Sequence, residues 1–410
     1  MTTIAEPADP RVGRSIFDPG VRLPAFVLRE TALAHDIEVM ATFCRERGLS
    51  FAPHGKTTMA PAIFRRQLDA GAWAITVADT WQAEIALKAE VDRILIANEV
   101  VDDAGLDWIG ATLKADASTP TLIVLVDSVT GVERMARRLA GSSRPLSVLV
   151  DVGAQGGRTG VRTVDDAVMV ANAVDHAAPM LRLAGVSFYE GVVAGDTLLE
   201  RQTGVRAMTN MTREIVERLA PLFERSGISE IVVSGGGSTY PDVVADEFGR
   251  PWAASHPVRP VMRSGAYVTH DHGIYERRSP FGMRAAAGAP RLEPAIEVWA
   301  PVLSVPEPGL AIAGAGRRDL PVDQDLPVVV RIRSSDGSED LQPRRAEPGF
   351  TVTALNDQHA FIALDDQASL AVGDLVGFGI SHPCTSFQVW REALLIDDAD
   401  RVIDVYTLHF

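Results

Sequence analysis

Short apolar runs alternate with stretches of helical length from about Leu23 to Val233. Each run has the length of a buried strand, and each stretch between runs is long enough for one amphipathic helix. Eight runs at this spacing predict a parallel sheet closed into a (β/α)8 barrel. They read PAFVL, LSFAPHG, WAITVAD, DRILIAN, TLIVLVD, LSVLVDVG, LAGVSFYEG and EIVVSGGG. An open, doubly wound sheet is the alternative, but the first strand-to-helix turn lacks the G-x-G-x-x-G signature of a dinucleotide-binding domain.

The pattern changes after Tyr275, where strand-like segments separated by turn residues replace the helical periodicity. They read AIEVWAPVLSV, LPVVVRIRS, FTVTALNDQHAFIAL and DLVGFGISHPC, which predicts a mainly antiparallel β domain. We therefore expect a barrel domain over residues 23–275 and a β domain over residues 276–410, to which residues 1–22 also belong. The turn at Asp336-Gly337 lies in SSDGSEDLQPRRAEPG, which we expect to be an exposed loop.

Composition narrows the class of protein. The 410 residues are 46% hydrophobic and 23% charged, as in an ordinary globular protein, and the net charge is −15. This charge disfavours a nucleic acid or an anionic membrane as partner, because phosphate groups would be repelled. The N-terminal residues lack the apolar core of a signal sequence, and no apolar run is long enough to span a bilayer. The two cysteines, Cys44 and Cys384, exclude a disulfide scaffold, so we expect a cytoplasmic protein.

The first candidate for chemistry is Lys56, in the segment FAPHGKTTMAP. It follows a predicted barrel strand and precedes a helix, and catalytic residues of barrels gather at the carboxyl ends of the strands. A lysine that acts through its amine must be neutral, and desolvation at a barrel mouth favours the neutral form. The plain alternative is a surface lysine in a loop.

The segment SGGGSTY, residues 234–240, follows the last predicted barrel strand. Three glycines allow backbone N–H groups to converge on an anion, and Ser234, Ser238 and Thr239 add hydroxyl groups. A tight turn that needs glycine for conformational reasons is the alternative. A lysine at one strand end and a phosphate cradle at another together indicate pyridoxal 5′-phosphate, whose aldehyde and phosphate need these two partners.

Two further segments lie at predicted strand ends. Arg158, in DVGAQGGRTGV, would point into the same mouth, where it could meet the cofactor's phenolate oxygen or a substrate carboxylate, or it is a surface arginine. The segment MRSGAYVTHDHGIY ends the predicted barrel. On a strand, its His270 and His272 would share a face without Asp271. We therefore expect a hydrogen-bond network at the domain junction, with a metal site as the alternative.

The last candidate is SHPCTSF, in which His382 and Cys384 are separated by one residue. In an extended segment both side chains would lie on one face. An imidazole and a thiolate form a good zinc pair, and two protein ligands leave coordination positions open, as in a catalytic site. The alternative is a buried cysteine that behaves as a small hydrophobic residue beside an unrelated histidine.

These segments, in this order, resemble the fold-type III pyridoxal phosphate enzymes of the D-serine dehydratase and D-threonine aldolase group, which are related to alanine racemase. The resemblance covers nearly the full length. It rests on LPAFVL, PHGKTTMAP, DVGAQGGRTG, SGGGSTY, MRSGAYV, LNDQHAFI and SHPC. It implies that Lys56 carries the cofactor as a Schiff base and removes the α-proton of a D-amino acid. It also implies that His382 and Cys384 bind the metal and that the protein is a homodimer.

The resemblance further implies the remaining site residues. His359, in DQH where the family has EEH, corresponds to a histidine near the active site, and we expect it to be catalytic. Arg158 corresponds to the arginine near the phenolate oxygen, and Arg263 to the residue near the pyridine nitrogen. The expected cofactor-binding residues are Lys56, Arg158, Tyr189, Ser234, Gly236, Gly237, Ser238, Arg263, Gly265 and Tyr267.

In this family a His-x-Cys pair with zinc is typical of the dehydratases, whereas His-x-Asp with manganese or magnesium is typical of the aldolases. We therefore expect a zinc-dependent dehydratase that converts a small D-3-hydroxy amino acid into a 2-oxo acid and ammonia. A metal-dependent D-threonine-type aldolase is the main alternative. A racemase, a non-enzymatic pyridoxal phosphate carrier and a metal-free Schiff-base sugar aldolase are less favoured.

Overall fold

A computed structural model describes residues 9–114, 120–335 and 342–410. The chain divides into two compact units that are interleaved along the sequence. We call them the β unit, which comprises Met1–Val39, Thr57–Ala62 and Ala266–Phe410, and the barrel unit, which comprises Met40–Lys56 and Ile63–Gly265. The expected domain limits stay a prediction.

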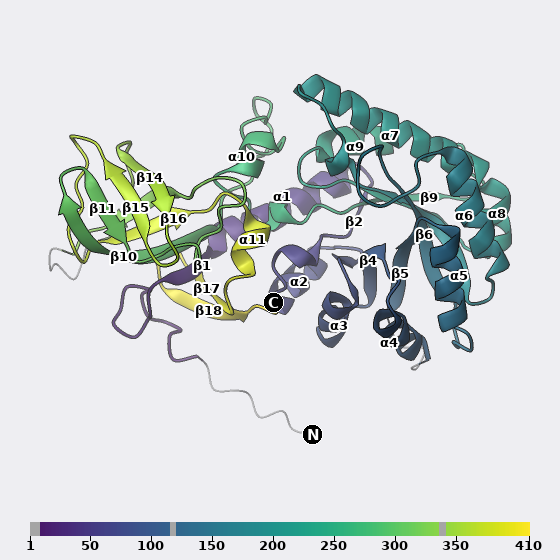
Figure 1. Ribbon diagram of the computed structural model, residues 1–410, viewed down its shortest axis with the longest axis horizontal. Helices are drawn as coiled ribbons and strands as arrows, with labels where there is room; N and C mark the ends of the chain where they lie inside the picture. The colour runs from purple at the N-terminus through teal and green to yellow at the C-terminus, as the bar shows by residue number, and fades with distance from the viewer. Residues whose placement is uncertain (1–8, 115–119, 336–341) are drawn as a thin grey trace. The chain divides into compact units, whose positions relative to one another are not determined.

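The barrel unit is built on eight parallel strands in the order β2-β9-β8-β7-β6-β5-β4-β3 (Figure 1). The two ends of this order also meet, because the Trp73 N–H donates to the Phe51 carbonyl (2.6 Å) and the Thr76 N–H to the Pro53 carbonyl (2.9 Å). The predicted (β/α)8 barrel is therefore confirmed. Its strands are β2 (Ser50–Phe51), β3 (Ile75–Val77), β4 (Arg93–Glu99), β5 (Thr121–Val126), β6 (Leu146–Val152), β7 (Leu181–Phe188), β8 (Ile231–Gly235) and β9 (Val258–Met262).

Helices follow the barrel strands, and several begin at a side-chain cap. Asp79, Ser128, Thr163 and Thr197 each accept a hydrogen bond from a backbone N–H in the first turn of the following helix, which satisfies a donor that the helix itself leaves unpaired. The helices are α2 (Pro61–Asp69), α3 (Thr80–Lys88), α4 (Asp103–Lys114), α5 (Val129–Arg138), α6 (Val164–His176), α7 (Leu198–Arg218), α8 (Ala220–Ser226) and α9 (Pro241–Phe248).

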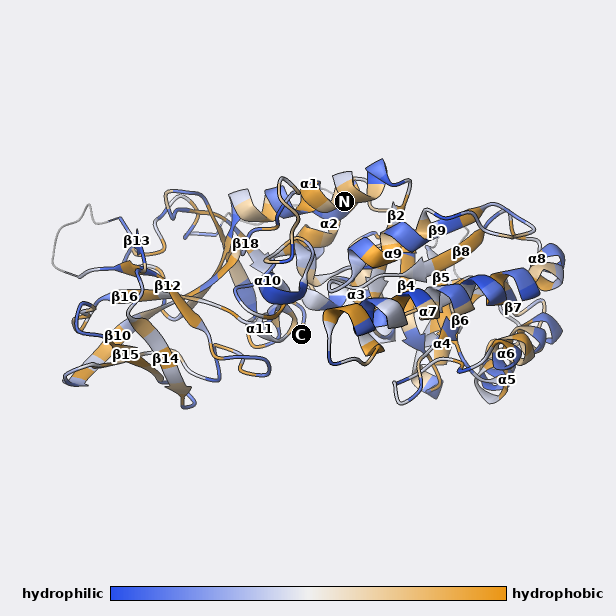
Figure 2. Cartoon of the chain, turned by 90° about the horizontal axis from the view of Figure 1, so that it is seen from above, coloured by the Kyte–Doolittle hydropathy of each residue, from blue (hydrophilic) through white to orange (hydrophobic). Residues whose placement is uncertain are grey.

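Buried aliphatic side chains from neighbouring strands fill the barrel interior. Leu95, Leu125, Leu149, Val232 and Val261 belong to one core cluster, to which β4, β5, β6, β8 and β9 each contribute one of these residues. In Figure 2, β8 and β9 carry mainly the hydrophobic colour. This packing fixes the strands whose carboxyl ends carry the candidate site residues.

The prediction that PAFVL opens the barrel is wrong. Those residues form β1 (Ala25–Arg29), which pairs with β10 and β17 in the β unit. The eighth barrel strand is β9, whose sequence VRPVM contains an arginine and a proline and so lacks the apolar run of a typical buried strand. As a consequence, SGGGSTY follows β8, the seventh barrel strand rather than the last.

The β unit contains a ten-stranded sheet, and among its described strand pairs only β1 and β17 run parallel. The predicted mainly antiparallel β domain is therefore confirmed. Its other strands are β10 (Ile296–Glu307), β11 (Leu310–Ala313), β12 (Val328–Arg333), β13 (Arg344–Arg345), β14 (Phe350–Leu355), β15 (Ala360–Leu364), β16 (Leu375–Gly379), β17 (Glu392–Ile396) and β18 (Val402–Thr407). Two short helices, α10 (Ile274–Arg278) and α11 (Pro383–Phe387), also lie in this unit, and α1 (Glu30–Glu46) begins in it.

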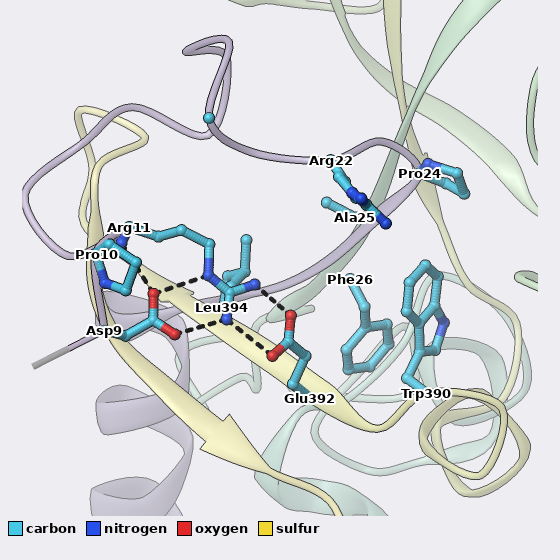
Figure 3. Close-up of a pocket in the computed structure, with 11 residues that line it drawn as sticks. Asp9, Pro10, Arg11, Arg22, Pro24, Ala25, Phe26, Trp390, Glu392 and Leu394 are labelled. Carbon is cyan, nitrogen blue, oxygen red and sulfur yellow. Dashed lines mark hydrogen bonds and ion pairs between the residues drawn. The ribbon is translucent and has the colours of Figure 1, made fainter. Parts of the chain in front are cut away.

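Gly13 and Arg14 in the N-terminal segment pair with Val402 in the β unit. The Gly13 N–H donates to the Val402 carbonyl, and the Val402 N–H donates to the Arg14 carbonyl (both 2.8 Å). Arg11 binds both Asp9 and Glu392, and the Arg11 hydrogen bonds lower the pKa of Asp9 to about 2 (Figure 3). A pocket of about 450 Å³ lies beside this ion pair.

Two expectations fall wholly or partly outside the described residues: the pairing of residues 1–8, and the exposed loop around Asp336-Gly337. None of the described helices combines the length and the hydropathy that a membrane span requires.

Candidate functional site

The glycine-rich turn after β8 can be built only with glycine at its centre. Gly236 has φ +85°, and a Cβ atom there would lie 2.0 Å from the Met262 sulfur. A Cβ atom on Gly237 would lie 2.9 Å from the Tyr189 ring. The turn leads directly into α9, whose first backbone amides have no partner within the helix. Such a turn exposes amide donors to an anion.

This turn already binds one anionic side chain. Glu190 follows β7 and is 1% exposed, and its Oε1 accepts the Gly237 N–H at 2.5 Å. Burial raises the pKa of Glu190, although the amides of Gly237 and Gly236 oppose that shift. The sequence interpretation missed Glu190, whose only signal was its position after the strand in SFYEG. The contact shows that the turn can donate a backbone amide to a carboxyl oxygen.

Two buried hydroxyl groups lie beside the turn. Ser187 on β7 and Ser234 on β8 are register partners, and both residues are fully buried. Neither hydroxyl has a hydrogen-bond partner within the described ranges of the chain. Because buried polar groups are normally paired, two adjacent unpaired hydroxyls suit a polar ligand at this end of the barrel. The expected residue Ser238 is half-buried, and Gly265 is buried after β9.

Arg263 is buried directly after β9. It donates to the Phe188 carbonyl through its guanidinium, and its backbone N–H donates to the carbonyls of Gly235 and Gly236 (both 3.1 Å). Burial lowers the pKa of Arg263, whereas the carboxylates of Asp151 and Glu190 raise it. The Nε–H of Arg263 has no acceptor among the described residues, so it remains for a ligand atom.

Lys56 lies in a short 3-10 helix, Gly55–Thr57, which follows β2, and it is half-buried. The neighbouring His54 has its pKa lowered well below the usual value by burial and by the positive charges of Lys56, Arg263 and Arg158. His54 is therefore neutral. Three expected cofactor residues in the barrel unit thus act electrostatically on one imidazole.

Lys56 also differs from the other lysines. The chain contains three, Lys56, Lys88 and Lys114, and the other two are exposed on helices. Lys88 pairs with Glu84 at 2.8 Å, one turn away on α3. Of the three amines, only that of Lys56 lies at a strand end of the barrel.

Arg158 is exposed, and its guanidinium lies over the Tyr189 ring at 4.5 Å from the ring centroid. Tyr189 is 37% exposed, and its ring also borders Gly237, where an added Cβ atom would lie 2.9 Å from it. The barrel unit thus connects the expected residues Arg158, Tyr189 and Gly237 in one chain of contacts.

In the β unit, His382 and Cys384 lie next to each other, although not in the predicted extended segment. His382 is the N-cap residue of α11, and Cys384 lies in the first turn of that helix. His382 Nδ1 is 2.6 Å from Asp323 Oδ2, and the Cys384 sulfur is 3.3 Å from the hydroxyl of Thr57, the residue that follows Lys56 in the chain. Burial lowers the pKa of His382, but hydrogen bonds and charge interactions with Cys384 and Asp323 raise it by more. The resulting pKa is about 9.

This donor set fits a metal ion. Asp323 fixes Nδ1 of the imidazole, which leaves the other ring nitrogen and the thiol as neighbouring donors. The alternative thiol, Cys44, is buried, and burial raises its pKa to about 12, so it behaves as a hydrophobic residue. The residues that the structure describes contain no group of three or more His, Cys, Asp or Glu side chains that could hold a metal. A pair of protein ligands leaves positions open for substrate.

The remaining predicted residues lie elsewhere in the β unit. Tyr267 is buried in the 3-10 helix Ala266–Val268. His359 is exposed in the hairpin between β14 and β15.

The H-D-H segment forms the expected hydrogen-bond network, but not on a strand. His270 has φ +43° and bonds Glu276 at 3.0 Å. Asp271 accepts the backbone N–H groups of Gly273, Tyr275 and Glu276 and so fixes the start of α10. Three backbone N–H groups thus converge on one oxygen of the Asp271 carboxylate.

Several known proteins resemble this chain in sequence. A family profile described as "Putative serine dehydratase domain" matches residues 295–396, in the β unit. The D-threonine aldolase of Arthrobacter sp. is 25% identical over 396 residues, which cover 96% of this chain and 92% of that protein. The D-threo-3-hydroxyaspartate dehydratase of Delftia sp. (strain HT23) is 25% identical over 352 residues, which cover 85% of each protein.

Solved structures share the fold. The D-threonine aldolase from Filomicrobium marinum superposes with a TM-score of 0.76 at 24% identity, over 94% of this chain and 95% of that chain. A Cys-to-Ala mutant of a D-threo-3-hydroxyaspartate dehydratase, solved in the metal-free form, gives a TM-score of 0.70 at 22% identity, over 95% and 98% of the two chains. The chain is thus similar over nearly its full length, in sequence and in fold, to D-threonine aldolases and D-threo-3-hydroxyaspartate dehydratases, and part of its β unit matches the serine dehydratase profile.

Proposed function

We propose that the protein is a pyridoxal phosphate- and zinc-dependent dehydratase that converts a small D-3-hydroxy amino acid into a 2-oxo acid and ammonia. The observation that carries the proposal is the hydrogen-bonded pair of His382 and Cys384, in which Asp323 orients the imidazole. A His-to-Ala and a Cys-to-Ala mutant of a D-threo-3-hydroxyaspartate dehydratase have been solved, the latter metal-free, and the two altered positions are two residues apart. His382 and Cys384 have the same residue types at the same spacing.

Pyridoxal phosphate, when bound, supplies an electron sink that stabilises negative charge at the substrate α-carbon. Lys56 carries the cofactor and then removes the α-proton as general base. Gly236, Gly237 and Ser238 bind the phosphate through the turn after β8, and Ser234, Tyr189, Gly265 and Tyr267 complete the expected binding set. Arg158 binds the phenolate side of the cofactor, and Arg263 lies near its ring nitrogen.

His382 and Cys384 would hold zinc, with manganese or magnesium as alternatives. When bound there, the metal would supply Lewis-acid polarisation for a substrate β-hydroxyl, which would leave as water after Lys56 has taken the α-proton. Hydrolysis of the resulting enamine gives the 2-oxo acid and ammonia. We retain His359 as a catalytic candidate for proton delivery to the leaving hydroxyl. The substrate is a small molecule, and we expect a cytoplasmic homodimer without nucleic-acid or membrane partners.

A metal-dependent aldolase is the second candidate. It would use the same cofactor residues but break the Cα–Cβ bond, giving glycine and an aldehyde. The observation that favours it is the similarity to the D-threonine aldolases of Arthrobacter and Filomicrobium marinum. The His-x-Cys pair makes us prefer elimination.

The cofactor assignment is tested by trapping. The protein is incubated with pyridoxal phosphate, reduced with borohydride and digested, and the peptides are analysed by mass spectrometry. We expect the phosphopyridoxyl label on the Lys56 peptide alone, because only that lysine lies at a strand end. Lys56→Ala should lose both the label and the activity, whereas Lys88→Ala should retain both. Label on Lys88 or Lys114 instead, or activity in Lys56→Ala, would overturn the assignment.

A further inference from the structure

Glu190 places a buried carboxylate on the amide that the proposed function assigns to phosphate. Its Oε1 lies 2.5 Å from the Gly237 nitrogen, and the residue is 1% exposed. Its second oxygen, Oε2, is buried and has no hydrogen-bond partner in the part of the chain that the structure describes. The turn therefore holds a carboxylate with half of its acceptor capacity unused.

A phosphate at the same turn conflicts with this arrangement. A backbone N–H donates one strong hydrogen bond, so the carboxylate and a phosphate oxygen compete for Gly237. Two anions within a few ångströms also repel each other strongly away from water. One nearby cation, Arg263, could relieve the repulsion, but Arg263 also interacts with Asp151.

The local geometry keeps the Glu190 carboxylate close to the proposed phosphate position in any side-chain conformation. A Cβ atom on Gly237 would lie 3.2 Å from Glu190 Oε1 and 2.9 Å from the Tyr189 ring, so side chain and turn are in direct contact. Glu190 begins a 3-10 helix, Glu190–Val192, which fixes its backbone. The side chain can release Gly237 by rotation or by binding a proton, but its backbone stays in place.

We propose that Glu190 competes with the phosphate group of the cofactor for the Gly237 amide and so sets the affinity of the protein for phosphorylated pyridoxal compounds. Before cofactor binding the carboxylate satisfies the turn. Cofactor binding then requires that the carboxylate leave Gly237 or lose its charge, and the free energy of that change weakens binding. The inference rests on the proposed function, because it takes the turn after β8 as the phosphate site.

The test compares wild type with Glu190→Gln, which keeps an oxygen acceptor for Gly237 and removes the charge. Dissociation constants are measured by absorbance titration for pyridoxal phosphate and for pyridoxal, which lacks the phosphate. We expect Glu190→Gln to bind pyridoxal phosphate at least about tenfold more tightly than the wild type, because one repulsive charge is removed. The affinity for pyridoxal should change by less than about twofold, because pyridoxal has no phosphate to repel. Glu247→Gln, which removes a buried carboxylate on α9, is the matched control and should bind both compounds like the wild type.

The inference is overturned if Glu190→Gln binds pyridoxal phosphate equally or more weakly, or if it tightens pyridoxal binding to the same extent. If Glu190→Gln does not fold, Glu190→Asp withdraws the carboxylate by one methylene and should also tighten binding of the phosphorylated compound. An Asp variant that binds no more tightly than the wild type would likewise overturn it. If the wild-type protein binds no pyridoxal phosphate, the proposed function itself fails.

Discussion

Asp323 determines which nitrogen of His382 can face a metal ion. Its Oδ2 lies 2.6 Å from Nδ1, and its other oxygen accepts the Thr385 hydroxyl at 2.7 Å. The carboxylate is thus fixed at both oxygens and holds the imidazole in one orientation. Carboxylate partners of this kind fix the tautomer of a metal-binding histidine and increase its basicity.

We expect Asp323→Asn to weaken zinc binding by about 10- to 100-fold, because the amide orients the ring less firmly and carries no charge. The measurement is competition with a chromophoric chelator, which reports affinity independently of turnover. Asp325→Asn is the matched control, since Asp325 is a neighbouring carboxylate that pairs with Arg277 instead. Equal zinc affinity of Asp323→Asn and wild type would contradict the role of Asp323.

At this scale the sequence could predict residues that lie in short, characteristic segments. Lys56, Arg158 and the His382/Cys384 pair were predicted from their own neighbours in the chain. Glu190 and Asp323 could not be predicted, because their partners lie far away in sequence, at Gly237 and His382. Such contacts depend on how loops from different strands meet.

At the scale of elements, the turn after β8 depends on backbone conformation. Gly236→Ala would place a methyl group against the Met262 sulfur in a left-handed conformation. We expect the free energy of unfolding to fall by about 2–5 kcal/mol, the sum of the conformational and packing costs. Affinity for pyridoxal phosphate should fall as well, because the amides of the turn move.

Urea unfolding and cofactor titration check this prediction. Gly249→Ala, at the end of α9, is the control, because Gly249 has φ −68° and the nearest atom to an added Cβ lies 3.6 Å away. The control should match the wild type in both measurements. A Gly236→Ala protein with unchanged stability would show that the turn tolerates a side chain and does not require glycine at position 236.

The sequence predicted β1 as a barrel strand in place of β9, which shows what an apolar run can and cannot indicate. Hydrophobic periodicity indicates that PAFVL is a buried strand, and it is one. It does not indicate which sheet the strand joins, because burial on both faces occurs in the β unit as well. The pairing of β1 with β10 and β17 depends on residues about 270 or more positions away.

At the scale of the whole molecule, stability should depend on pH through buried acids of the barrel. Burial and the negative charges of Asp151 and Asp127 raise the pKa of Glu99 from 4.5 to about 7. The folded state therefore binds this proton more tightly than the unfolded chain. The contribution of Glu99 to the free energy of unfolding is then largest at low pH and falls as the pH rises from about 4.5 to about 7.

Glu99→Gln stays neutral at every pH and so removes this dependence. We expect it to match the wild type at pH 4.5 and to exceed it at pH 8 by on the order of 2 kcal/mol, allowing for partial solvent screening. Urea unfolding at the two pH values gives the comparison. If the free energies of unfolding of the two proteins differ by the same amount at both pH values, the raised pKa of Glu99 is contradicted.

The architecture of the whole chain was the most predictable level. Alternation of apolar runs and helical stretches predicted the barrel, and the change of pattern after Tyr275 predicted the antiparallel strands. Both follow from periodicity, which is a local property. The reaction is less predictable, because a D-threonine aldolase and a D-threo-3-hydroxyaspartate dehydratase both share the fold of this chain.

Product identification with D-threonine therefore tests the central claim most directly. The purified protein is incubated with D-threonine, pyridoxal phosphate and zinc, and products are quantified by mass spectrometry and an ammonia assay. We predict 2-oxobutanoate and ammonia in equal amounts, both lost in Cys384→Ala. Glycine and acetaldehyde in their place would contradict the dehydratase assignment and identify an aldolase.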